Sequence, residues 1–146
     1  MALDETCKEA NFQRSILKHL VDNLKTALSI DVIDDPSIPT PTLVGSGMSK
    51  WVRPIYGSMD LGNVSSADLE LHCCTRKDVG RIEATALRDT VLGLFANTPI
   101  PLYNVTTWAV IGHMYSIILP SPGNYVEEDS TKADVLAIRL KWGAVI

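Results

Sequence analysis

The sequence lacks long apolar runs, and no segment approaches the roughly 18 consecutive apolar residues that suggest a membrane-spanning helix. The first residues, MALDETCKEANFQR, contain no apolar core of the kind that a signal peptide has. Positive charge is also scarce, since 13 Lys and Arg stand against 17 Asp and Glu, a net charge of -4. A protein that grips phosphates or an anionic membrane needs a basic surface. The composition therefore argues against a membrane partner and against sequence-specific nucleic-acid binding.

Cysteine is rare and poorly spaced for binding a metal ion. The chain has 3 cysteines, Cys7, Cys73 and Cys74. Adjacent residues of a strand point to opposite faces, so Cys73 and Cys74 cannot bind one ion together without a distorted backbone. An odd number of thiols fits a reducing compartment better than a secreted scaffold. Neither a metal site nor a disulfide framework is predicted.

Catalytic motifs are absent as well: the chain contains no GxxxxGK[ST], no GxGxxG and no GxSxG. Glu70 and His72 share one face of a predicted strand, a geometry that suits a general base and its orienting carboxylate. A solvent-facing strand edge explains the same pair without catalysis. His19 lies beside Lys18, off the apolar stripe of its predicted helix, and is expected to be solvated. We therefore expect no enzymatic activity, cofactor or metal; a small enzyme or ligand-binding domain around Glu70, His72 and Trp51 is the weakest alternative.

Two segments have the apolar periodicity of amphipathic helices. The first covers about residues 8–30, with a stripe formed by Phe12, Ile16, Leu20, Leu24 and Leu28. The second covers about residues 77–96, with a stripe formed by Val79, Ile82, Ala86, Val91, Leu94 and Phe95. Between them, the prolines of DDPSIPTPT exclude a helix and predict an extended segment over residues 36–42.

Alternating apolar and polar residues predict the strands. The expected strands cover residues 31–34, 50–56, 66–75, 102–111, 115–119 and 133–142. Residues 57–65, between the second and third strands, are expected to form a long hairpin-tip loop. Strands that follow one another in sequence favour antiparallel pairing and leave both helices free to cover one face. We predict a single α+β domain over residues 1–146: an antiparallel sheet, two main helices on one face, and the long tip loop.

Several apolar residues occur outside the predicted core, at positions where the fold of a monomer does not explain an apolar side chain. Met59 and Leu61 flank Asp60 in the predicted tip loop, and apolar residues in a long loop suggest a contact surface. The final strand is followed by Ala144, Val145 and Ile146, which continue the apolar character beyond the regular alternation. Trp142 is expected in the core, whereas the position of Trp51 is left open. The candidate protein-interface residues are therefore Met59, Asp60, Leu61, Trp51, Ala144, Val145 and Ile146.

The order of these pieces resembles the tail terminator proteins of long-tailed bacteriophages, small α+β proteins that form a hexameric ring capping the tail tube. The opening helix FQRSILKHLVDNLKTAL and the proline-rich DDPSIPTPT come first. WVRPIYGSMDLGNVSSADLELHCC then looks like that family's hairpin, RIEATALRDTVLGLF its second helix and ADVLAIRLKW its closing strand. The resemblance covers nearly the whole chain and is one of element order.

This resemblance implies a virion structural protein that caps the tail tube, stops its polymerisation and forms the docking surface for the head. The implied partners are further copies of the chain in a ring, expected to be hexameric, the tail tube protein, and a neck or head-completion protein. The implied location is the head-proximal end of the tail, after assembly in the host cytoplasm, with DNA passing through the ring. A head–tail neck adaptor or stopper is the main alternative. In a closed ring, neighbouring subunits would cover a terminal strand and its apolar tail.

Overall fold

A computed structural model describes residues 9–32, 50–60, 64–75, 82–96, 99–126 and 132–143. Within these ranges the elements are α1 (Glu9–Leu20), the π-helical η2 (Val21–Thr26), β1 (Asp31–Val32), β2 (Lys50–Asp60), β3 (Val64–Thr75), α2 (Ile82–Phe95), β4 (Ile100–Tyr103), β5 (Val110–Ile118), β6 (Asn124–Val126) and β7 (Lys132–Gly143). The strands form one sheet in the order β1-β2-β3-β7-β5-β4, and β6 pairs with β7 as well. Because β1 runs parallel to β2, the sheet is mixed. The α+β class is confirmed.

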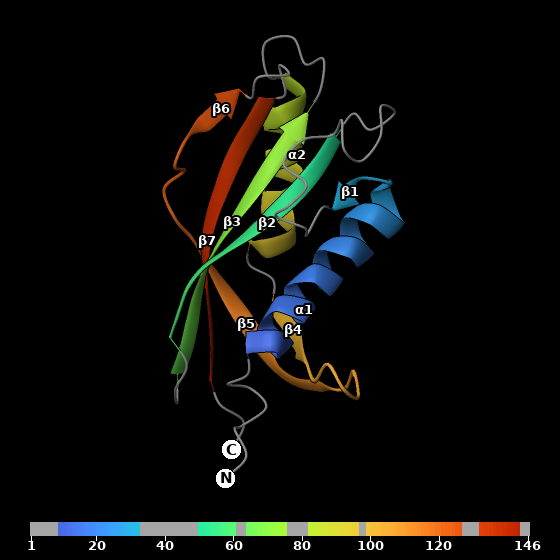
Figure 1. Cartoon of the computed structure of the whole chain (residues 1–146), viewed down its shortest axis with the longest axis vertical. Coiled ribbons are helices and arrows are strands. Elements are labelled where there is room, and N and C mark those ends of the chain that lie inside the picture. Colours follow the sequence, from blue (N-terminus) through green and yellow to red (C-terminus); the bar gives the residue numbers. More distant parts are fainter. Residues whose placement is uncertain are drawn as a thin grey trace.

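Both helices pack on one face of the sheet, as predicted, and we call this the inner face (Figure 1). Alternate residues of β3 and β7, such as Leu71 and Leu136, meet the apolar sides of α1 and α2 there. Trp142 is 2% exposed and belongs to this core, which confirms its expected position. No helix in the described ranges is long and apolar enough to cross a membrane.

The stripe of the first helix is confirmed from Phe12 to Leu24, all of whose stripe residues are at most 1% exposed. The expectation for Leu28 is wrong, because its side chain is 52% exposed. The helix widens into η2 and then ends at Ser29, whose φ of 57° lies in the left-handed region that often terminates helices. The backbone N–H of Ile30 donates to the carbonyl of Leu24 at 2.9 Å as the chain turns away. Leu28 therefore lies past the last turn that faces the core.

His19 is half-buried, so its predicted solvation is wrong. Its Nε2 lies 2.9 Å from the carbonyl oxygen of Leu94, and its ring meets that of Phe95 edge-on, with centroids 5.2 Å apart. Both contacts come from the end of α2. The local sequence around His19 contains no sign of them, because they depend on how the two helices pack.

The second helix is also rotated relative to its predicted stripe. Its buried side chains are Ala84, Leu87, Val91 and Phe95, whereas Ile82 is 72% exposed and Ala86 is exposed. Val91 and Phe95 were predicted correctly. The segment carries apolar residues on several sides, so periodicity alone does not determine which side meets the sheet.

The long hairpin-tip loop is not observed. β2 continues to Asp60 and β3 begins at Val64, so only residues 61–63 separate the two strands. The strand pairing contains a β-bulge, since Tyr56 pairs with Leu69 and Met59 pairs with Ala67. Two residues of β2 therefore oppose a single residue of β3 at this point.

The bulge determines which way Met59 points. Simple alternation from the inward-facing Tyr56 would turn Met59 outward, and the extra residue of the bulge returns it to the inner face. Met59 is accordingly half-buried and packs against the core. At the bulge, a Cβ on Gly57 would lie 3.2 Å from the carbonyl oxygen of Asp68, so the two strands approach closely there.

Candidate protein-interaction face

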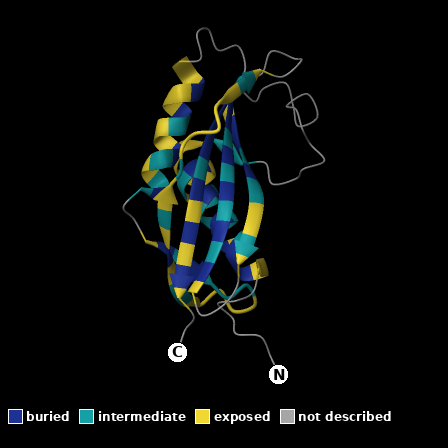
Figure 2. Cartoon of the chain, turned by 90° about the vertical axis from the view of Figure 1, so that its left-hand side faces the viewer, coloured by how far each residue is buried: buried dark blue, intermediate teal, exposed yellow. Residues whose placement is uncertain are grey.

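The face of the sheet opposite the helices, which we call the outer face, carries the less buried half of the alternating pattern (Figure 2). On β3 its residues include Asp68, Glu70 and His72, and on β7 they include Ala137 and Arg139. The two ends of this face, upper and lower as drawn in Figure 1, differ in character. The upper end is covered by β6, whereas the lower end carries exposed residues in the part of the chain that the structure describes.

Trp51 lies at the upper end, inside the subunit. It pairs with Cys74 across β2 and β3, Cys74 pairs with Ala133 of β7, and Tyr125 of β6 packs against the three. Trp51 is only 1% exposed. Its side chain therefore offers almost no surface to a partner, and its place is a small satellite core beneath β6.

The two described thiols are buried on opposite sides of β3. Cys73 points into the main core and Cys74 into the satellite core beside Trp51. Burial, above all, raises the pKa of the Cys73 thiol far above its ordinary value, and the neighbouring Cys74 adds to the shift. A thiol that stays protonated is a poor nucleophile and a poor metal ligand. This arrangement supports a packing role for Cys73.

Glu70 and His72 do lie side by side, as predicted, but a third residue completes the group. His72 Nε2 is 3.1 Å from Oε1 of Glu70, and His72 Nδ1 is 2.7 Å from the hydroxyl oxygen of Tyr125. A neutral ring satisfies both contacts if Nε2–H donates to Glu70 and Nδ1 accepts the Tyr125 hydroxyl, a tautomer assigned from these partners. Of these two contacts of His72, the one with Tyr125 therefore ties β3 to β6.

The lower end of the outer face is built from three rows of paired residues. The first row joins Tyr115, Lys141, Ser66 and Asp60; the second joins Ile117, Arg139 and Asp68; the third joins Leu119, Ala137, Glu70 and Ile55. We call these eleven residues the lower outer face. Tyr115 is 60% exposed and Ile117 is 45% exposed, although both stand on a regular strand. The two residues are two apart on β5, so their side chains lie on the same side of the strand.

An ion pair crosses the middle of this face. Arg139 Nε donates to Asp68 Oδ1 at 2.8 Å, and both side chains are partly exposed. The hydrogen bond to Asp68, together with its charge, raises the pKa of Arg139 above its ordinary value, so the guanidinium stays charged. Lys141 and Asp60, both exposed, extend the charged region along the first row. Exposed apolar side chains and an ion pair therefore lie together on this face.

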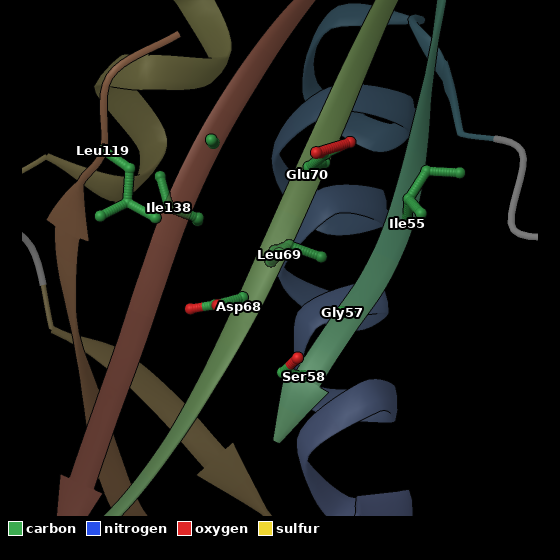
Figure 3. Close-up of a pocket in the computed structure, with 9 residues that line it drawn as sticks. Ile55, Gly57, Ser58, Asp68, Leu69, Glu70, Leu119 and Ile138 are labelled. Atoms are coloured by element: carbon green, nitrogen blue, oxygen red, sulfur yellow. The ribbon is translucent and has the colours of Figure 1, made fainter. Parts of the chain in front are cut away.

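A hollow of about 350 Å³ opens beside the ion pair, above the bulge of β2 (Figure 3). Its lining consists of Ile55, Gly57, Ser58, Asp68, Leu69, Glu70, Leu119, Ala137 and Ile138. Gly57 contributes no side chain, which helps to leave the space open. A second hollow of about 310 Å³ shares Ser58 and Asp68 with the first and continues toward Asp60 and Lys141. Together they form a shallow groove large enough for protruding side chains.

The predicted interface residues fall into three groups. Asp60 lies on the lower outer face and lines its groove, whereas Met59 packs inward and Trp51 is buried. Leu61, Ala144, Val145 and Ile146 lie outside the described residues.

Sequence reasoning missed Tyr115, Ile117 and Arg139 as surface candidates. Alternation over residues 115–119 does place Tyr115, Ile117 and Leu119 on one side of a strand. The pattern does not reveal that this side faces away from both helices, because that depends on how β5 joins β7.

Among the described residues, no group of three or more His, Cys, Asp or Glu side chains could hold a metal ion. No model of a known protein family matches this chain, and no curated protein matches it either.

Proposed function

We propose that this chain is a virion structural protein of the tail terminator kind, which assembles into a ring that caps the phage tail tube and stops its growth. The element order of the sequence supports this proposal, and so does the α+β architecture with both helices on one face. The observation that carries it is the lower outer face, where Tyr115 and Ile117 remain exposed beside the Arg139–Asp68 pair. A ring subunit needs such a surface and needs no catalytic group.

The proposed mechanism is steric. A contact between two different surfaces of the same chain is repeated from copy to copy, and it yields a ring when the rotation closes and a filament when it does not. One side of the ring would bind the last ring of the tail tube protein, and the other side would present a new surface to a neck or head-completion protein. The protein would then reside at the head-proximal end of the tail after assembly in the host cytoplasm.

The net charge of -4 supports a ring through which DNA passes without being bound tightly. A channel lined by an acidic chain does not bind the phosphates of passing DNA strongly, since such binding depends on Lys and Arg. The hydrogen bonds that join Glu70, His72 and Tyr125 support a structural role for the pair that the sequence offered as a possible general base and its carboxylate.

Two measurements test the proposal together. Negative-stain electron microscopy and native mass spectrometry of the purified chain are expected to show closed rings of one size. Addition of these rings to a polymerising tail tube protein is expected to end tube growth, measured as tube length against ring concentration. Rings that leave tube growth unchanged and instead bind a head-completion protein would indicate a neck adaptor or stopper. A monomeric chain without effect on tubes would contradict the proposal.

A further inference from the structure

The turn between β4 and β5 holds an exposed tryptophan in a backbone conformation that bulky residues rarely adopt. Trp108 has φ of 58°, in the left-handed region that Gly and Asn accept far more easily, and its side chain is 48% exposed. The indole is not needed to fill a core, and the backbone would be less strained with glycine. A residue held in such a strained backbone conformation is a candidate for a functional role.

The turn is held by hydrogen bonds on both sides of Trp108. The backbone N–H of Trp108 donates to the carbonyl of Asn104 at 2.6 Å, and the N–H of Asn104 donates to the carbonyl of Ala109 at 2.9 Å. Helix α1 adds a further contact, because Oδ1 of Asn11 accepts from the N–H of Val105 at 3.0 Å. A side chain presented by such a preorganised turn loses little conformational entropy on binding.

The neighbours of the indole make a largely apolar tip, and the ion pair of Lys18 and Asp22 lies next to it. The ring of Tyr103 lies 6.1 Å from that of Trp108, and Val110 is 52% exposed. Lys18 places its Nζ 5.5 Å from the centre of the Tyr103 ring while it also pairs with Asp22. Tryptophan is enriched among the residues that dominate binding energy at protein interfaces.

The hollow of the lower outer face matches this tip in size and chemistry. Its volume of about 350 Å³ lies at the low end of the range of about 300–1,000 Å³ for ligand pockets, which suits a single large side chain. Ile55, Leu119 and Ala137 supply apolar walls. The polar side chains of the lining are Ser58, Asp68 and Glu70, all of which can accept a hydrogen bond. A buried indole needs an acceptor for its N–H group, and these side chains can supply one.

We infer that Trp108 of one copy of this chain inserts into the hollow of the lower outer face of the next copy. The turn lies at the lower right of Figure 1, and the outer face is turned to the left, so the two surfaces are on opposite sides of the subunit. A contact between them is heterologous and repeats from copy to copy. This inference rests on the proposed function, since it names the contact that joins the subunits of the proposed ring.

Two single variants test the two halves of the contact by sedimentation velocity. Trp108→Gly removes the indole and relieves the strained backbone, and Ala137→Arg fills the hollow. Each is expected to raise the Kd between copies by at least about 30-fold, the effect of losing a dominant interface residue. The melting temperature of the Trp108→Gly subunit is expected to be unchanged or higher. Ile82→Ala, on an exposed part of α2, is the matched control and is expected to assemble as the parent does.

A mixture of the two variants gives the sharpest result. Trp108→Gly retains an intact hollow and Ala137→Arg retains an intact Trp108, so the two are expected to form a 1:1 heterodimer that neither forms alone. If Ala137→Arg fails to fold, Ser58→Arg, at an exposed position of the same lining, takes its place. Rings that survive both substitutions, or a mixture that stays monomeric, would overturn the inference and leave the proposed ring standing. A parent chain that stays monomeric would overturn both.

Discussion

The aromatic rings of Phe12 and Trp142 are stacked, with centroids 5.2 Å apart and planes only 9° from parallel. The first belongs to the opening helix and the second to the closing strand, so this pair joins the two ends of the described chain across the core. Trp142 pairs with Ser65 in the sheet, one residue along from the row that contains Lys141 and Ser66. The stack therefore lies in the core on the inner side of the strands that form the lower outer face.

Replacement of Phe12 with Ala is expected to lower the free energy of unfolding by about 3–5 kcal/mol, because it removes a ring that is 1% exposed and leaves a cavity beside Trp142. Urea denaturation measures the change. Tyr115→Ala removes a ring of similar size that is 60% exposed, and it serves as the control with an expected change of about 0.5 kcal/mol or less. Equal losses for the two variants would contradict the assignment of the inner and outer faces.

The end of the first helix gives a second test, with two leucines four residues apart. Leu24→Ala is expected to cost about 2–5 kcal/mol of unfolding free energy, since Leu24 is fully buried in η2. Leu28→Ala is expected to cost no more than about 0.5 kcal/mol, since Leu28 is 52% exposed. Thermal melts followed by circular dichroism resolve such a difference. A costly Leu28→Ala would mean that the helix continues to face the core beyond Ser29.

The tie between β6 and β3 gives a third test. Tyr125→Phe retains the ring that packs on Trp51 and Cys74 and removes the hydroxyl that meets His72 Nδ1. The expected loss is about 0.5–1.5 kcal/mol of unfolding free energy, the usual net value of one hydrogen bond. Hydrogen exchange of the amides of β6 is expected to accelerate in the variant. Unchanged stability and exchange would show that ring packing alone holds β6 in place.

The environment of His19 predicts how stability depends on pH. Burial lowers the pKa of His19, and it outweighs the opposing effects of the hydrogen bond to the carbonyl of Leu94 and of the charge of Asp22. The unfolded chain, in which the pKa is about 6.5, therefore takes up the proton first as the pH falls. The contribution of neutral His19 to stability is complete above about pH 6.5 and is lost as the pH falls through the lower pKa of the folded state.

The variant His19→Gln removes this titration and retains an amide donor for the Leu94 carbonyl. The difference in unfolding free energy between the parent chain and His19→Gln is expected to shift against the parent as the pH falls from 7.5 to 5. The two proteins differ only at position 19, so the difference isolates the contribution of this residue. Urea melts at several pH values measure it. A difference that stays constant over this range would show that the pKa of His19 is not lowered by folding.

Much of the fold was predictable because its elements are long and regular. The fourfold spacing from Phe12 to Leu24 determines the buried side of the first helix, and alternation from Leu136 to Trp142 determines the inner side of β7. These patterns are local, and burial on one side is enough to produce them. The α+β class follows from the order of such segments along the chain.

The remaining features depend on contacts between distant segments. The bulge at Gly57 and Ser58 reverses the direction of Met59, and it lies where β2 closely approaches Asp68 of β3. The tie of His72 to Tyr125 spans 53 residues, and only the path of the chain after β5 brings the two together. The same holds for the lower outer face, whose residues come from β2, β3, β7, β5 and the residue that follows β5. A single segment carries no sign of such a surface.

The exposed pair Tyr115 and Ile117 gives the last test, because assembly and folding should respond differently to its loss. The double substitution to Ser at both positions is expected to change the unfolding free energy of the subunit by about 1 kcal/mol or less, since both side chains are largely exposed. The same variant is expected to assemble poorly, because a partner that covers this face would lose two apolar contacts and gain two hydroxyls to desolvate. Urea melts at low protein concentration and sedimentation velocity at high concentration separate the two effects, with Ile82→Ser as a control at another exposed apolar position. Normal assembly combined with a loss of several kcal/mol of stability would assign both residues to the subunit's own core and would leave the lower outer face without its main apolar contacts.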